Sequence, residues 1–168
     1  LNFAAAIQPL LGTVGGDCLV ASRVGHDDGG ELLQKAMQAH NLSPVLLQST
    51  TAEPTGLSLA EVKSQGDVAF HLEPGAWDEI AWSEALREQA AVCVGLLAGS
   101  LPLRSPVSAA TMVALFQTSS ASVRMFDLNF RHEPESTLLT SVLEAATHVK
   151  GTVEEWVQLG TILSCQAD

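Results

Sequence analysis

Three polar side chains alternate with apolar ones in the segment FDLNFR, residues 126–131. The segment closes an apolar run typical of a buried strand, so Asp127, Asn129 and Arg131 stand at the carboxyl end of that strand. Ligands of open parallel sheets bind beyond such ends. Arg131 could hold an anion or sugar hydroxyls, and Asp127 could act through a metal or a hydrogen bond. The structural alternative is that Asp127 caps a turn and Arg131 pairs with it.

Two other predicted strand ends carry glycine or acidic residues. Residues 96–101 read LLAGSL, where Gly99 would let the backbone approach a ligand closely. Residues 23–30 read RVGHDDGG, with His26, Asp27 and Asp28 adjacent. That cluster suggests a metal site, but neighbours in sequence point apart, and an acid more often caps the helix that follows.

Strand-like and helix-like segments alternate along most of the chain. Helices are predicted at residues 2–11, 30–40, about 78–89 and 153–163. Two more are predicted: one is capped by Ser105 and has Pro106 in its first turn, and the other starts near residue 134. Strands are predicted at 17–25, 91–97, 122–128 and 148–150. This order is typical of an α/β fold with a mostly parallel sheet covered on both faces.

Residues 44–72 interrupt that alternation. Short strand-like runs at 44–49, 56–63 and 68–72, with a turn at 64–67, predict an antiparallel flap or lid inserted into a single domain of residues 1–168. The alternating apolar residues of LSLAEV and VAFHL would leave one face exposed. We therefore expect a second copy of the chain to cover it.

Composition excludes several classes of protein. The 168 residues are 46% hydrophobic and 16% charged, which is enough for a compact core. A net charge of −11 disfavours nucleic-acid binding, and the apolar runs are too short for a bilayer. Three widely spaced cysteines suit a reduced, cytoplasmic protein. The chain lacks a secretion signal and an initiator Met, so we expect a piece of a longer protein.

Seven segments, in order, resemble the ribokinase-like carbohydrate kinases of the PfkB family, and FDLNFR with GSLPLRSP is most similar to the fructokinase branch. The segments are NFAAAIQPLLG, SRVGHDDGGELLQKAMQAHNL, EPTGLSLAEV, LEPGAW, LAGSLPLRSPVSAAT, FDLNFR and VKGTVEEWVQL. The resemblance implies a truncated three-layer α/β/α sandwich with a small β lid. It also implies phosphoryl transfer from ATP, with Mg²⁺, to a sugar hydroxyl, fructose being the first guess. The competing hypothesis is a non-catalytic relative that keeps the fold for binding or assembly.

The resemblance also assigns roles to single residues. Asn2 matches an asparagine that contacts sugar hydroxyls, Gly99 lies where the family's chain passes the sugar, and Asn129 and Arg131 lie toward the phosphoryl and sugar end. Glu155 matches the glutamate of an Asn-x-x-Glu pair that organises magnesium-bound water, but Thr152 replaces the asparagine. Asp127 is a further possible metal contact.

The family's catalytic base is not found in this sequence. It resides in a Gly-Ala-Gly-Asp segment at a helix N-terminus, and neither Gly/Asp-rich place, VGHDDGG or TVGGDCLV, qualifies. We therefore expect the base to lie C-terminal to Asp168 and the chain alone to be inactive.

Overall fold

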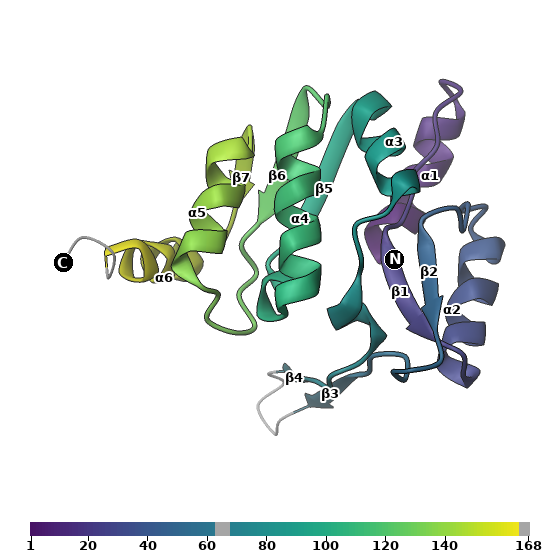
Figure 1. Cartoon of the computed structure of the whole chain (residues 1–168), viewed down its shortest axis with the longest axis horizontal. Coiled ribbons are helices and arrows are strands. Elements are labelled where there is room, and N and C mark those ends of the chain that lie inside the picture. Colours follow the sequence, from purple (N-terminus) through teal and green to yellow (C-terminus); the bar gives the residue numbers. More distant parts are fainter. Residues whose placement is uncertain (63–67, 165–168) are drawn as a thin grey trace. The chain divides into compact units, whose positions relative to one another are not determined.

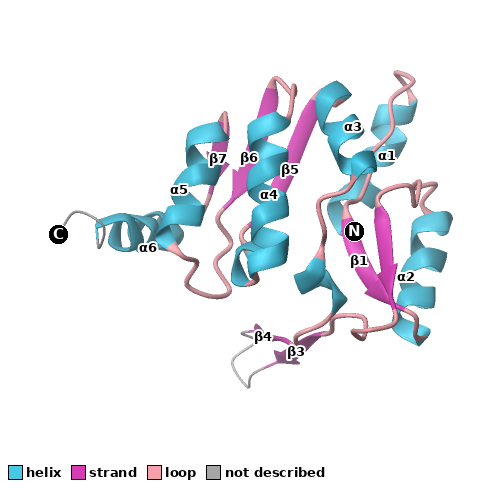
Figure 2. Ribbon diagram, in the orientation of Figure 1, coloured by secondary structure: helices cyan, strands magenta, loops and turns pink. Residues whose placement is uncertain are grey.

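Helices and short strands alternate along the computed structural model, which describes residues 1–62 and 68–164 (Figures 1 and 2). The structure divides into two units, Leu1–Ile80 and Ala81–Asp168. The prediction that residues 1–168 form a single domain stays a prediction. No described helix has the length and apolar character needed to cross a membrane.

The first unit contains two separate pairs of strands. Its elements are α1 (Asn2–Gly12), β1 (Ser22–Gly25), α2 (Asp28–Ala39), β2 (Leu47–Thr50), β3 (Ser58–Val62), β4 (Val68–Leu72) and the 3₁₀ turn η1 (Ala76–Glu79). β1 and β2 pair in parallel, whereas β3 and β4 pair in antiparallel. The predicted boundary of the lid was therefore wrong. Residues 47–50 extend the parallel pairing, and only β3 and β4 form the antiparallel lid.

The predicted strand at 17–25 was too long. The buried Gln8 side chain accepts a hydrogen bond from the backbone N–H of Cys18 at 2.7 Å and donates one to Asp17 at 3.1 Å. The backbone there is satisfied by a side chain, and ladder pairing begins only at Ser22. The predicted turn at 64–67 lies outside the described residues.

Asp27 fastens the start of α2 to the segment that leads into the lid. Its carboxylate accepts hydrogen bonds from the N–H of Gly30 at 2.9 Å, from the N–H of Thr55 at 2.7 Å and from the Thr55 hydroxyl at 2.6 Å. The Thr55 oxygen in turn accepts from the N–H of Gly25 at 2.9 Å. The capping role expected for an acid at 26–28 is thus confirmed for Asp27.

These hydrogen bonds lead to a prediction about pH. The Thr55 donors, followed by Gly30, lower the pKa of Asp27 from 3.8 to about 2. A carboxyl group with a lowered folded-state pKa stabilises the fold above its unfolded pKa, and this contribution is lost as the pH falls through the folded value. We expect Asp27→Asn to be less stable than wild type at pH 7, and the difference to shrink as the pH falls from about 4 to 2.

Urea unfolding midpoints at several pH values measure this difference. Asp28→Asn is the matched control, since it removes a neighbouring, exposed carboxylate from the same helical turn. A gap between wild type and Asp27→Asn that stays constant down to pH 2 would contradict the prediction.

The second unit is built around a three-stranded parallel sheet with the order β5-β6-β7. Its elements are α3 (Glu84–Val92), β5 (Gly95–Gly99), the 3₁₀ turn η2 (Leu101–Arg104), α4 (Pro106–Thr118), β6 (Val123–Asp127), α5 (Ser136–Ala145), β7 (His148–Lys150) and α6 (Val153–Ser164). The helix predicted at 78–89 is in fact η1 followed by α3. Ser83 accepts a hydrogen bond from the N–H of Leu86, so α3 begins only at Glu84.

Apolar residues from β6, η2, α4, α5 and α6 form the core of this unit. α4 and α5 lie on the same face of the sheet (Figure 1). Phe126 and Leu128, at the end of β6, are fully buried, and the Phe126 ring meets Phe116 of α4 edge-to-face with the centroids 6.2 Å apart. The end of β6 is therefore rigidly anchored, and the polar residues that alternate with Phe126 and Leu128 project from a fixed support.

Candidate functional site

The carboxyl ends of the three parallel strands lie in register. Gly99, Asp127 and Lys150 occupy one row across β5, β6 and β7. Beyond this row, the N–H of Leu128 donates to the carbonyl of Lys150 at 2.8 Å, which extends the pairing past the end of β6. The structure thus brings together four candidate segments at one edge: 99–101, 127–131, 150–152 and the start of α6.

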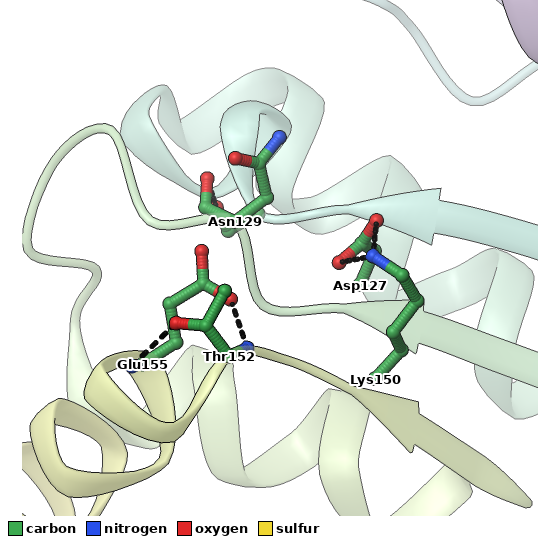
Figure 3. Close-up of polar contacts among 6 residues, drawn as sticks. Asp127, Asn129, Lys150, Thr152 and Glu155 are labelled. Carbon is green, nitrogen blue, oxygen red and sulfur yellow. Dashed lines mark hydrogen bonds and ion pairs between the residues drawn. The ribbon is translucent and has the colours of Figure 1, made fainter. Parts of the chain in front are cut away.

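Asp127 and Lys150 form an ion pair at this edge. The Lys150 Nζ lies 3.0 and 2.9 Å from the two carboxylate oxygens (Figure 3). The hydrogen bond and the charge of Asp127 raise the pKa of Lys150. A metal at Asp127 would have to displace this ammonium group. Lys150 had no predicted role, although the pairing of β6 with β7 places it in register with Asp127.

Thr152 and Glu155 form a capping box at the N-terminus of α6. The N–H of Thr152 donates to Oε2 of Glu155 at 2.8 Å, and the N–H of Glu155 donates to the Thr152 hydroxyl at 3.2 Å (Figure 3). Thr152 therefore fixes the position of Glu155. The replacement of asparagine by threonine leaves an ordered pair, because threonine is also a good N-cap.

The other carboxylate oxygen of Glu155, Oε1, makes no hydrogen bond within residues 1–62 and 68–164. One open carboxylate oxygen fits contact with Mg²⁺ through a water molecule. The same described residues contain no group of three or more His, Cys, Asp or Glu side chains that could hold a metal alone. A magnesium ion at Glu155 would thus need water or a phosphate for its remaining ligands.

The remaining predicted residues are placed as follows. Asn129 and Arg131 are exposed beyond the end of β6. A Cβ atom added to Gly99 would lie 3.6 Å from the carbonyl oxygen of Asp127, an ordinary contact, so packing does not require glycine there. Asn2 is the first residue of α1, in the other unit, and is exposed. The ligand roles of all four residues stay predictions.

Parallel strands with polar residues at their carboxyl ends and an acidic helix N-terminus define an α/β protein of the kind whose ligands bind beyond the carboxyl ends of the strands. The chain matches the model of the pfkB family carbohydrate kinases over residues 1–162 and belongs to that family.

Solved structures show which fold the chain has. A fructokinase from Xylella fastidiosa is 20% identical, with a TM-score of 0.78, over 95% of this chain and 52% of its own. An uncharacterized sugar kinase from Pyrococcus horikoshii in complex with ATP is 20% identical, with a TM-score of 0.79, over 94% of this chain and 55% of its own. A Burkholderia thailandensis nucleoside kinase in complex with inosine is 18% identical, with a TM-score of 0.72, over 97% of this chain and 50% of its own.

The chain therefore has the ribokinase-like α/β fold and spans about half the length of these solved structures. No curated protein sequence matched it in a direct comparison.

Proposed function

We propose that the protein containing this chain is an ATP-dependent sugar kinase, which transfers the terminal phosphoryl group of ATP to a sugar hydroxyl. The family match over residues 1–162 is the observation that carries this proposal. The ATP complex among the similar structures supports ATP as the donor. Free Cys18 and Cys93 suit a reduced compartment, and we place the protein in the cytoplasm.

The sheet edge supplies groups suited to a polyhydroxylated ligand and to phosphate. Gly99 leaves room beside β5, the amide of Asn129 can donate to and accept from hydroxyls, and Arg131 can pair with a phosphoryl oxygen. When bound, Mg²⁺ would neutralise charge on the phosphates, and Glu155 would hold one of its waters. The ion pair with Lys150 makes Asp127 a poor metal ligand by comparison.

Fructose is the first substrate to test. The similarity to a fructokinase and the segments FDLNFR and GSLPLRSP support it. A nucleoside kinase is similar to a comparable extent, so nucleosides belong in the panel. The second candidate function, a non-catalytic binding or assembly protein, is favoured by one observation: Thr152 stands in place of the family's asparagine.

Kinetics of the full gene product test the proposal. We expect ADP release that depends on one sugar and on Mg²⁺, and we expect Glu155→Gln to lower kcat/KM about tenfold or more and to raise the Mg²⁺ concentration needed. Glutamine preserves an acceptor for the N–H of Thr152, so the helix cap should survive. Glu144→Gln is the control, because this acid is exposed near the C-terminus of α5. Sugar and ATP binding without turnover would favour the non-catalytic function.

We also propose that two copies associate through the β lid. Every residue of β3 is exposed. Val62 pairs with Val68 and Ala60 with Phe70, so an apolar row lies on one face of the lid. Exposed Val62, Val68 and Phe70 would be covered in a dimer of this kind.

Light scattering at micromolar concentration checks this association. We expect wild type to have the mass of a dimer and Phe70→Glu to have that of a monomer, because a charge on the apolar row would have to be buried without a partner. Val157→Glu is the control, since it adds the same charge at an exposed site on α6. A monomeric wild-type protein would refute the proposal.

A further inference from the structure

Asn129 has a backbone conformation that residues other than glycine rarely adopt. Its φ angle is +27°, and the only other non-glycine residue with positive φ among those the structure describes is Asn41, at +54°. Asn41 follows the end of α2, where a left-handed residue is an ordinary helix terminator. Asn129 follows a strand end, so its conformation needs another support.

That support comes from both neighbouring strands. The hydroxyl of Ser100, which is 1% exposed, donates to the carbonyl oxygen of Asn129 at 3.1 Å. On the other side, Leu128 is bound through its N–H to Lys150, and its fully buried side chain lies against Gly151. A Cβ atom at Gly151 would lie 2.7 Å from Cδ1 of Leu128. Residues 128 and 129 are thereby fixed from two directions.

We propose that Ser100 is a positioning residue that holds Asn129 in this conformation and thereby presents its amide to the sugar substrate. The inference rests on the proposed kinase function and adds a specific role for a residue outside the predicted site. A buried hydroxyl requires a hydrogen-bond partner, and the Asn129 carbonyl provides it. The strained backbone of Asn129 then sets the direction of its exposed side-chain amide at the carboxyl ends of the strands.

The alternative role for Asn129 is purely structural, since asparagine tolerates left-handed backbone and would then serve only to make the turn. Asn129→Gly separates the two roles. Glycine adopts positive φ without strain but has no amide. We expect this variant to fold at least as stably as wild type and to lose about 10²-fold in kcat/KM for the sugar. Full activity of Asn129→Gly would overturn the proposal.

Ser100→Ala tests the positioning role in the full gene product. Because Asn129 is exposed, water can replace the lost donor and the fold should persist. We expect kcat/KM for the sugar to fall about 10²-fold, since small misplacements of binding groups have effects of that size. In the Asn129→Gly background, Ser100→Ala should cause no further loss, because its effect acts through the amide. Additive losses would overturn the proposal.

Ser120→Ala is the matched control. Its hydroxyl also donates to a backbone carbonyl, that of Ala91 at 2.8 Å, but it precedes the amino end of β6. We expect this variant to keep wild-type kinetics. Loss of kcat/KM equal to that of Ser100→Ala would show that any such bond in the unit matters, and it would overturn the specific role of Ser100.

Backbone chemical shifts distinguish failure of this inference from failure of the proposed function. They report the φ angle of Asn129 whether or not the protein has activity. We expect left-handed values in wild type and a shift to negative φ in Ser100→Ala. Retention of left-handed values in Ser100→Ala would overturn the proposal. A wild type without turnover would refute the kinase function, and the shifts would still decide the role of Ser100. Should Ser100→Ala not fold, Asn129→Gly alone decides.

Discussion

Gly30→Ala is expected to lower the free energy of unfolding by about 3 kcal/mol, because the added methyl group would clash with backbone atoms. A Cβ atom at this position would lie 2.2 Å from the carbonyl oxygen of Gly25 and 3.3 Å from the Thr55 hydroxyl. The first of these is a backbone atom of β1 and cannot rotate away. To accept the methyl group, α2 must move away from the strand, and the hydrogen bond from Gly30 to Asp27 is strained.

Gly160→Ala is the control for that substitution. Gly160 lies inside α6, is exposed, and has no atom within 4 Å of an added Cβ. Alanine should therefore raise stability by about 0.5–1 kcal/mol through helix propensity. Urea unfolding of both variants measures the two free energies. Equal stability of Gly30→Ala and wild type would show that α2 and β1 do not pack closely enough to exclude a methyl group at this position.

Prediction from sequence succeeded where the period of apolar residues and the helix caps agreed. The helix after Ser105 and Pro106 and the strand 148–150 fall where expected, although the Ser105 side chain makes no capping hydrogen bond. It failed where the competing partner of a backbone group was distant in sequence. Gln8 satisfies the N–H of Cys18, and β2 pairs with β1, and neither contact has a local sequence signal. The start of the lid was misplaced for that reason.

In the candidate site, too, features with a local sequence signal were predicted and contacts between distant residues were not. The alternation of Asp127, Asn129 and Arg131 with apolar residues was sufficient to predict a polar strand end. The sequence did not predict the register between neighbouring strands, so the ion-pair partner of Asp127 was missed. That partner is Lys150, on the next strand. The Thr152–Glu155 capping box has a recognisable Thr-x-x-Glu pattern, and the family resemblance drew attention to the missing asparagine instead. The role of Ser100 depends on a backbone angle, which no residue pattern reveals.

Purified residues 1–168 alone are expected to release no sugar-dependent ADP above background, whereas the full gene product should turn over. Phosphoryl transfer needs a group that accepts the hydroxyl proton and donors that hold the phosphates. Positioned acid–base groups contribute roughly 10²–10⁴-fold, and each lost donor about 10²–10³-fold more. Gly16 and Asp17 precede a segment without regular secondary structure and then β1, not a helix, so they do not provide the family's base and anion hole.

Asp127 is the one strand-end acid of the candidate site that could act as a substitute base, and its surroundings argue against it. Both carboxylate oxygens accept hydrogen bonds from Lys150, so uptake of a substrate proton would break an ion pair. A coupled ADP-release assay with ATP, Mg²⁺ and a panel of hexoses, pentoses and nucleosides measures the activity of the chain. Asp127→Asn is assayed in parallel. Turnover of about 1–100 s⁻¹, as in ordinary kinases, that disappears in Asp127→Asn would mean that the catalytic base lies within this chain after all.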